Sequence, residues 1–329
     1  MMLTVRESLP AGFLETRPEE IAGLLHGPTL MHLGGRQARP LFVSVLLHGD
    51  EPTGLLAVQR LLRDYGDRSL PRALSLFVGN VYAAEKGVRF LAGRHDYNRI
   101  WGGGRDPEHE MARAVVADMR ARRVAAAVDV HNNSGRNPHY AIIAQGDAAT
   151  LALAGGFSRI VVYGRYPDTT CTFAFSGHCP SVALEAGQAH ETQAVGRVAA
   201  YLDAALQAEA YEGDAQPDVE LFRSVAVVRV PRAVEFGWPG EGADLEFVEH
   251  LEEYNFRELA PGTLIARSRG CGGECLDVRD EHGHPVAARF FESLGGEIRL
   301  RVAATPAMLT RRREAIRMDC LGYLMERMG

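Results

Sequence analysis

Two short, mainly apolar runs of this chain each end in a histidine. The run Leu41–Leu47 is followed by His48, and the run 124–130 is followed by His131. Runs of this kind are typical of strands that are buried on both faces of a parallel sheet. The carboxyl ends of such strands meet at one edge of the sheet, where open α/β proteins bind their ligands. We therefore expect both imidazoles at that edge, together with Glu51, three residues after the first histidine.

Strand-like runs alternate with helix-period segments from about residue 40 to residue 205. The sequence predicts strands over residues 41–47, 73–78, 124–130, 139–144, 159–162 and 181–184, and helices over residues 53–65, 107–120 and 189–208. Such alternation predicts an α/β fold, with a mainly parallel central sheet and helices on both of its faces.

The character of the sequence changes at the polar stretch Tyr211–Asp218, which is typical of a linker. Beyond it, β-like stretches at 225–230, 264–266, 285–290 and 297–302 are separated by glycine and proline turns. The last stretch, 307–328, is expected to be partly helical. We therefore predict an α/β domain over residues 1–210 and a small β-rich C-terminal domain over residues 220–329.

The charge of the chain excludes some classes of partner. The 36 Lys and Arg residues and 42 Asp and Glu residues are mixed along the sequence, without a basic stripe, so we expect no nucleic-acid partner. No apolar stretch is long enough to span a bilayer, and the N-terminal residues do not follow the pattern of a signal peptide, so we expect a cytoplasmic protein without a membrane partner. The sequence leaves the oligomeric state open, with a homo-oligomer allowed.

His48, Glu51 and His131 together carry the chemistry of a metal site. Two histidines and one carboxylate are a three-ligand set for zinc that leaves a fourth position open for water. We expect one Zn²⁺ ion per chain. A purely structural zinc site is disfavoured, because such a site needs four protein ligands and the sequence offers no nearby cysteine. The alternative for His48 and Glu51 is a helix N-terminus with an acidic residue and an unrelated histidine.

Two further carboxylates have the positions needed to assist such a metal. Asp129 lies two residues before His131, on the same side of a strand, where it can accept the other imidazole N–H; the alternative is an acid facing solvent. Glu185 ends an apolar strand, and burial there should raise its pKa, which suits a general base. The alternative for Glu185 is an acid at the start of the following helix.

Asn98 and Arg99 lie side by side in the predicted loop Asp96–Trp101, with Arg89 and Arg94 just upstream. An amide beside a guanidinium can hold a substrate carboxylate through bidentate hydrogen bonds. We therefore expect a small-molecule substrate with a free carboxylate, bound by these residues. The alternative is an ordinary surface loop.

Four motifs now follow one another along the chain. They are His48-Gly-Asp-Glu51, Asp96-Tyr-Asn-Arg99, Asp129-Val-His131-Asn132 and Leu184-Glu185-Ala-Gly187. In this order they resemble the motifs of the succinylglutamate desuccinylase/aspartoacylase family, part of the zinc carboxypeptidase (M14-like) superfamily. Tyr254-Asn-Phe256 before Pro261-Gly262 is similar to that family's C-terminal domain. The resemblance implies a zinc carboxypeptidase-like fold, zinc on His48, Glu51 and His131, Glu185 as the general base, and Asn98 with Arg99 on the substrate.

The chain departs from the family pattern in three places. Asp50 stands where the family usually has asparagine, and Arg89 lies two residues farther from Asn98 than the family's arginine, so Arg89 and Arg94 are both candidates. No arginine stands shortly before Glu185, where Phe173, Phe175 and His178 are found instead. The missing arginine disfavours a strongly anionic acyl group such as succinyl.

These residues lead us to predict a zinc-dependent amide hydrolase, with an N-acyl amino acid as the first choice of substrate. A metallocarboxypeptidase that acts on short peptides is the alternative within the enzymes. A binding module that keeps zinc and the carboxylate clamp without turnover is the alternative outside them. Glu185 favours the enzyme, because a binding module has no need of a carboxylate at that position.

Overall fold

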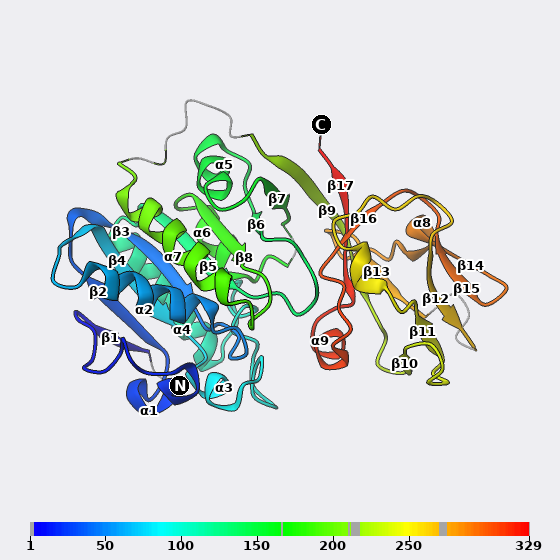
Figure 1. Cartoon of the computed structure of the whole chain (residues 1–329), viewed down its shortest axis with the longest axis horizontal. Coiled ribbons are helices and arrows are strands. Elements are labelled where there is room, and N and C mark those ends of the chain that lie inside the picture. The colour runs from blue at the N-terminus through cyan, green and yellow to red at the C-terminus, as the bar shows by residue number, and fades with distance from the viewer. Residues whose placement is uncertain (1–2, 166, 210, 212–217, 270–274, 329) are drawn as a thin grey trace. The chain divides into compact units, whose positions relative to one another are not determined.

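The computed structural model describes residues 3–165, 167–209, 211, 218–269 and 275–328. The chain divides into two compact units (Figure 1). The first unit comprises Met1–Asn132 and His139–Val219, and the second comprises Asn133–Pro138 and Glu220–Gly329. Most of the expected linker, residues 212–217, lies outside the described residues.

In the first unit, strands and helices alternate along the chain. Its strands are β1 (Thr4–Arg6), β2 (Thr29–Leu33), β3 (Gly35–Val45), β4 (Leu70–Val78), β5 (Ala126–His131), β6 (Tyr140–Ile143), β7 (Ile160–Tyr163) and β8 (Ser181–Glu185). Its helices are η1 (Pro18–Glu20), α1 (Ile21–Leu25), α2 (Thr53–Tyr65), α3 (Val81–Lys86), α4 (Pro107–Ala121), α5 (Ala148–Gly155), α6 (Cys171–Ser176) and α7 (Thr192–Gln207).

The strands of the first unit form one sheet in the order β1-β2-β4-β3-β5-β8-β6-β7. The pairs β2–β4 and β6–β8 are antiparallel, and the other pairs within this order are parallel. The central strands β3, β5 and β8 are parallel neighbours, so their carboxyl ends lie at the same edge. The prediction of a mainly parallel sheet is confirmed.

Helices cover both faces of this sheet. Phe42 of β3 stacks on Phe175 of α6 with ring centroids 4.4 Å apart, and it shares an apolar cluster with Met111 of α4. On the opposite face, a Cβ atom at Gly54 of α2 would lie 2.9 Å from Cγ1 of Val45, so α2 packs closely on the strand. Side chains three residues apart on a strand point to opposite faces, so α6 and α4 cover one face and α2 the other.

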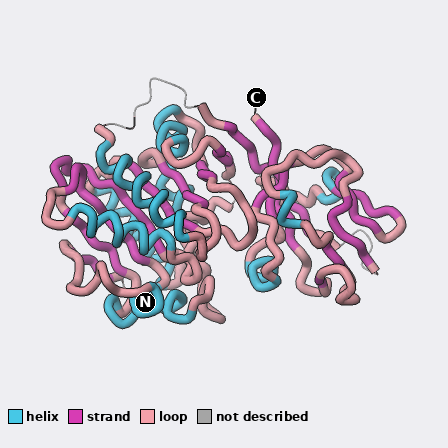
Figure 2. Tube along the Cα trace, in the orientation of Figure 1, coloured by secondary structure: helices cyan, strands magenta, loops and turns pink. Residues whose placement is uncertain are grey.

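The second unit consists mainly of strands and loops (Figure 2). Its elements are β9 (Glu220–Arg229), β10 (Phe236–Gly237), β11 (Leu245–Phe247), η2 (Leu251–Tyr254), β12 (Leu264–Ser268), β13 (Asp277–Arg279), α8 (Ala287–Phe290), β14 (Phe291–Leu294), β15 (Glu297–Leu300), β16 (Thr305–Ala307), α9 (Arg313–Met318) and β17 (Gly322–Arg327). Strands β10-β11-β12-β15-β14 form a five-stranded sheet, and β9 pairs with β13 and β17. The predicted β-rich C-terminal region is therefore present.

The short segment Asn133–Pro138 is held in the second unit by hydrogen bonds to Asn255. The Asn255 side-chain amide donates to the carbonyls of Arg136, at 2.9 Å, and Leu309, at 2.8 Å. Its Oδ1 accepts from the Leu309 amide at 2.9 Å. The structure thus gives Asn255 a structural role that joins three stretches of the second unit, and the sequence did not predict it.

One expectation about the second unit needs correction. Residues 285–290 were expected to be a strand, but α8 occupies Ala287–Phe290. A short, mainly apolar run fits a strand and a helical turn equally well, so its period does not decide between them. The expectation of partial helix near the end is confirmed by α9, which lies between the strands β16 and β17.

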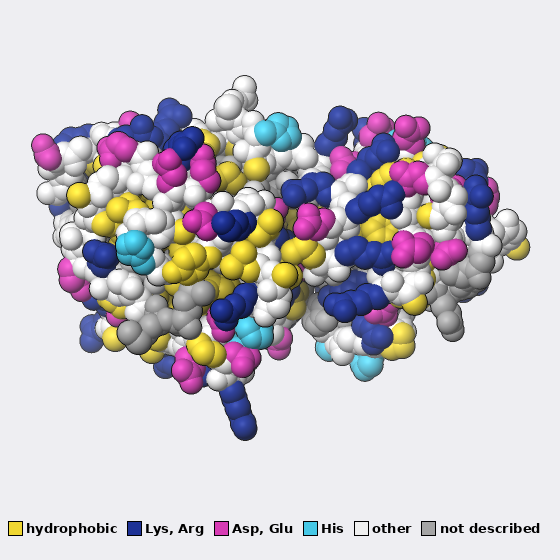
Figure 3. Space-filling view, turned by 90° about the horizontal axis from the view of Figure 1, so that it is seen from below, with side chains coloured by type: hydrophobic (Ala, Val, Ile, Leu, Met, Phe, Trp, Pro, Cys, Tyr) yellow, Lys and Arg dark blue, Asp and Glu magenta, His cyan; other side chains and the backbone are white. Residues whose placement is uncertain are grey.

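Charged side chains of both signs are interspersed on the face of the first unit that Figure 3 shows. Among the helices that the structure describes, none is both long enough and apolar enough to cross a membrane.

Candidate functional site

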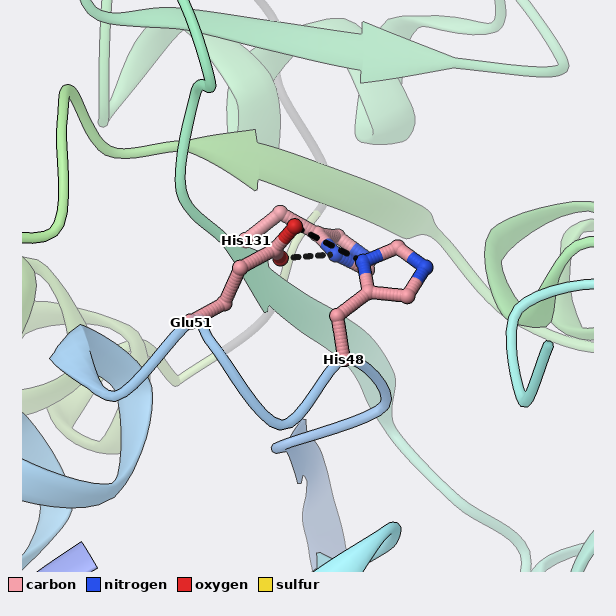
Figure 4. A group of neighbouring side chains, drawn as sticks. All are labelled: His48, Glu51 and His131. Carbon is pink, nitrogen blue, oxygen red and sulfur yellow. Dashed lines mark hydrogen bonds and ion pairs between the residues drawn. The ribbon is translucent and has the colours of Figure 1, made fainter. Parts of the chain in front are cut away.

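His48, Glu51 and His131 converge at the carboxyl edge of the first unit's sheet (Figure 4). Nδ1 of His48 lies 2.8 Å from Oε1 of Glu51, and Nδ1 of His131 lies 2.9 Å from Oε2 of the same carboxylate. One potential ligand atom from each residue lies within 4.8 Å of the other two, and all three residues are buried. Two imidazole nitrogens and a carboxylate oxygen in this arrangement are a donor set suited to zinc.

The loop after β3 reaches this position through two local features. Leu46 has a φ of 55°, in the left-handed region, so the chain leaves the strand direction directly after Val45. Gly49 lies against the backbone of α3, where an added Cβ would be 2.2 Å from the carbonyl carbon of Ala83. Only glycine allows this approach, which places His48 and Glu51 on either side of one tight turn.

Each imidazole has a carboxylate on its other nitrogen. Nε2 of His131 lies 2.7 Å from Oδ2 of Asp129, and Nε2 of His48 lies 3.1 Å from Oδ1 of Asp96. Carboxylates in these positions hold Nε2–H and leave the Nδ1 lone pairs for a metal. The Asp129 contact with His131 was expected from the sequence. The contact of Asp96 with His48 was not, and the only signal for it was the place of Asp96 in the Asp96–Arg99 motif.

The charges of this group shift its pKa values in opposite directions. Burial and the nearby Arg89 lower the pKa of His48, but Glu51 and Asp96 outweigh them and raise it above its ordinary value. Burial likewise lowers the pKa of His131, and Asp129 with Glu51 raises it well above its ordinary value. Burial raises the pKa of Glu51, but the two histidines lower it below its ordinary value. Glu51 is therefore ionised and able to bind a cation.

Glu185 ends β8 as the register partner of His131 on β5. The residue is buried, and its Oε2 has no hydrogen-bond partner among the described residues. Burial raises the pKa of Glu185 to about 8, although the charge of His131 acts in the opposite direction. A buried carboxyl with a raised pKa and one oxygen left without a partner among the described residues has the properties of a general base.

The structure separates the two upstream arginines. Nε of Arg89 donates a hydrogen bond to Oδ2 of Asp96, at 3.1 Å. The Arg89 guanidinium also lies 3.9 Å from Oε1 of Glu51. Arg94 is exposed and lies 3.6 Å from Glu108, at the start of α4. Arg89 therefore belongs to the charged group around Glu51, and Arg94 does not.

Asn98 and Arg99 lie in the same loop. Nδ2 of Asn98 lies 3.3 Å from Nε2 of His131, and its Oδ1 accepts from the Cys171 amide at the start of α6. Arg99 is half-buried and donates to the carbonyl of Asn98 at 3.0 Å. The loop thus places the Asn98 amide next to His131 and the Arg99 guanidinium against the backbone of Asn98.

Asn132 also holds the group in place, and the sequence reasoning assigned it no contact. Its backbone amide donates to Oε2 of Glu51 at 3.1 Å. Its side-chain amide donates to Oγ1 of Thr53 at 2.9 Å and to the carbonyl of Gly187 at 3.0 Å. Asn132 therefore ties together the chain segments that follow β3, β5 and β8.

A cavity of about 910 Å³ lies in the first unit. Its lining includes Phe173 and His178, which stand in the stretch where the family pattern has an arginine, and also Arg113, Arg120 and Arg165. The guanidinium of Arg165 lies 6.0 Å from the ring centroid of Phe173. Cationic side chains therefore lie near this stretch even though none stands in it, which the sequence spacing did not reveal.

Comparison with known protein families identifies a match over most of the first unit. Residues 37–199 match the model of the succinylglutamate desuccinylase/aspartoacylase catalytic domain. No curated protein matches the sequence.

Several solved structures share the fold. A succinylglutamate desuccinylase from Chromobacterium violaceum is 20% identical, with a TM-score of 0.56, over 89% of this chain and 86% of that one. Murine aminoacylase 3 is 16% identical, with a TM-score of 0.57, over 89% and 96%. A succinylglutamate desuccinylase/aspartoacylase from Rhodobacter sphaeroides is 16% identical, with a TM-score of 0.60, over 91% and 89%. The chain belongs to the succinylglutamate desuccinylase/aspartoacylase family, within the zinc carboxypeptidase (M14-like) superfamily.

Proposed function

We propose that the protein hydrolyses the amide bond of an N-acyl amino acid with the help of one zinc ion. The observation that carries this proposal is the register of β5 and β8. It sets Glu185, whose Oε2 has no hydrogen-bond partner among the described residues, beside His131 of the His48, Glu51 and His131 group. The similar solved structures include a desuccinylase and an aminoacylase, which supports the same class of reaction.

The residues of the group fit zinc by the chemistry of their donor atoms. Both Nδ1 atoms face the carboxylate of Glu51, while both Nε2 atoms are held by Asp96 and Asp129. His48, Glu51 and His131 would hold the ion, and the remaining position suits water or substrate. When bound, zinc polarises the scissile carbonyl and lowers the pKa of water to about 7.

Glu185 moves the proton in the proposed reaction. Its ionised carboxylate accepts a proton from the attacking water at Oε2, and the same oxygen then delivers that proton to the departing amine nitrogen. Glu185 is buried, so bulk water does not compete with its carboxylate as the acceptor of this proton. The positive charge of a bound metal favours the ionised form of Glu185 and so prepares the base.

The substrate carboxylate is assigned to Arg99, with Asn98 orienting the loop. A guanidinium binds a carboxylate through two parallel hydrogen bonds and so fixes the distance from that carboxylate to the scissile amide. Arg89 donates a hydrogen bond to the Asp96 carboxylate, which in turn contacts His48. We therefore assign Arg89 a positioning role.

The test is the release of free amine from a panel of N-acetyl, N-formyl and N-succinyl amino acids and of unblocked dipeptides. Zinc-loaded protein is compared with the Glu185→Gln variant, which keeps the shape of the side chain, and with Glu191→Gln as a control at a partly exposed acid. Turnover of an acylated amino acid that is lost only in Glu185→Gln supports the proposal. Turnover confined to dipeptides would favour the carboxypeptidase, and stoichiometric zinc without any turnover would favour the binding module.

A further inference from the structure

A second group of potential metal ligands lies outside the site described above. It consists of His95, Asp106 and His109, whose ligand atoms all lie within 4.8 Å of one another. Nε2 of His95 lies 3.0 Å from Oδ2 of Asp106, and Nδ1 of His109 lies 3.7 Å from the same oxygen. The two imidazole rings meet edge to face, with centroids 4.9 Å apart. One carboxylate oxygen is thus flanked by two imidazole nitrogens.

The carboxylate of Asp106 does not cap the helix at whose N-terminus it lies. Asp106 is the N-cap residue of α4, where an aspartate side chain normally accepts a hydrogen bond from the backbone of the first turn. Here its side chain makes no capping hydrogen bond and points at the two histidines instead. Helix α4 therefore lacks the stabilising side-chain cap that an aspartate at this position usually provides.

His109 supplies the second observation that points to a ligand. Only 12% of its side chain is exposed, and its Nδ1 is buried without a hydrogen-bond partner among the described residues. The ring is held against the backbone of Gly104, where an added Cβ would lie 2.3 Å from its Cδ2. A buried nitrogen that is fixed in place and lacks a hydrogen-bond partner has a free coordination position to offer.

We propose that His95, Asp106 and His109 form a second binding site for a divalent metal ion of the zinc class. Two imidazole nitrogens and one carboxylate oxygen suit such an ion, and three protein ligands leave a further position for water. Asp106, the N-cap of α4, and His109, in its first turn, are three residues apart, and His95 comes from the preceding loop. The ion ties that loop to the helix.

The consequence concerns the neighbouring residue in the loop. His95 points to the second site, while Asp96, the next residue, lies 3.1 Å from His48 in the first. An ion on His95 therefore restrains the segment that positions Asp96 and Asn98. Because two of the three ligands are exposed, we expect this site to bind metal more weakly than the buried one.

The test counts zinc ions bound per chain by the full-length protein over a range of buffered free zinc concentrations. We expect a tight first ion and a weaker second ion in the parent protein. His95→Gln and His109→Gln should each lose the second ion and keep the first, whereas Glu51→Gln should lose the first and keep the second. The His282→Gln variant is the control, because His282 and His284 form another exposed pair with rings 5.9 Å apart.

Hydrogen exchange supplies a readout that does not depend on activity. The second equivalent of zinc should slow amide exchange in residues 94–106 of the parent but not of His95→Gln. A single ion per chain at every zinc concentration overturns the proposal. So does a second ion that survives both His95→Gln and His109→Gln. Either result leaves the first site and the proposed hydrolysis untouched, so the two proposals fail separately.

Discussion

His131 and Glu185 are register partners on the adjacent parallel strands β5 and β8. Aligned residues of neighbouring strands place their side chains on the same face of a sheet, so the backbone sets this pair side by side. The amide of Ala186 donates to the carbonyl of His131 at 3.0 Å and continues the ladder beyond the pair. Because the ladder fixes the relationship, we expect substitution of either side chain to leave the other in place.

Glu185 should make the stability of the metal-free chain depend on pH. Its pKa is about 8 in the folded protein against 4.5 ordinarily, so between these values the folded state binds more protons than the unfolded state. The free energy of unfolding should therefore fall as pH rises through this window. Glu185→Gln should remove this part of the slope and gain about 4 kcal/mol over the parent near pH 8.

Urea unfolding of the metal-free parent and variant at several pH values measures this difference. Both proteins keep the contributions of His48 and His131, so subtracting one curve from the other isolates Glu185. Equal slopes for the two proteins would show that Glu185 does not titrate in this window. Added zinc should reduce the difference in pH dependence between the two proteins, because the cation lowers the pKa of the Glu185 carboxyl.

Asp96 and Asp129 should both support zinc affinity without binding the ion themselves. Each holds Nε2 of one histidine ligand, at 3.1 Å and 2.7 Å. Loss of such a partner typically weakens metal binding by about 10–100-fold. We expect Asp96→Asn and Asp129→Asn each to show a loss in this range when zinc is titrated against a competing chelator. Parent-like affinity in both variants would contradict the positions assigned to the two carboxylates.

The arginines of the loop should differ in their effect on the substrate. Arg99→Gln should raise KM by about tenfold or more, since it removes the guanidinium assigned to the substrate carboxylate. Arg94→Gln is the matched control, because Arg94 is exposed and lies beside Glu108. Steady-state kinetics on the best substrate of the panel measure both. A larger KM change in Arg94→Gln would reverse the assignment.

Gly49→Ala should destabilise the loop that carries His48 and Glu51. The new Cβ would lie 2.2 Å from the Ala83 carbonyl carbon, which is backbone and must move. Overpacking of this kind typically costs about 1–3 kcal/mol, and thermal unfolding measures it. Gly23→Ala, in α1 with nothing within 4 Å of its new Cβ, is the control and should stay close to the parent.

The parts of the fold that the sequence could predict are those with a strong local period. The helix expected over residues 53–65 is α2, because its apolar positions recur at helical spacing over more than three turns. Strand ends differ from the expectation by a few residues, as for β3, which ends at Val45 and not at Leu47. Strand β2 was missed, since its five residues lack alternation.

In the candidate site too, the sequence predicts the residues placed by regular strands but not the contacts made through an irregular loop. His48 and His131 could be placed at one edge because strand ends in a parallel sheet are brought together by topology alone. The contact between His48 and Asp96 joins residues 48 positions apart through an irregular loop, so no local period predicts it. The choice between Arg89 and Arg94 and the second group at His95 depend on the same loop, and only the structure resolves them.

The central claim is that zinc on His48, Glu51 and His131 enables amide hydrolysis, and zinc reconstitution tests it most directly. Chelator-treated protein is titrated with zinc while amine release from the best N-acyl amino acid is followed. We predict that activity is lost on chelation and recovers in proportion to zinc up to one equivalent per chain. Amine release that survives complete removal of zinc, or that never returns with it, would contradict the account.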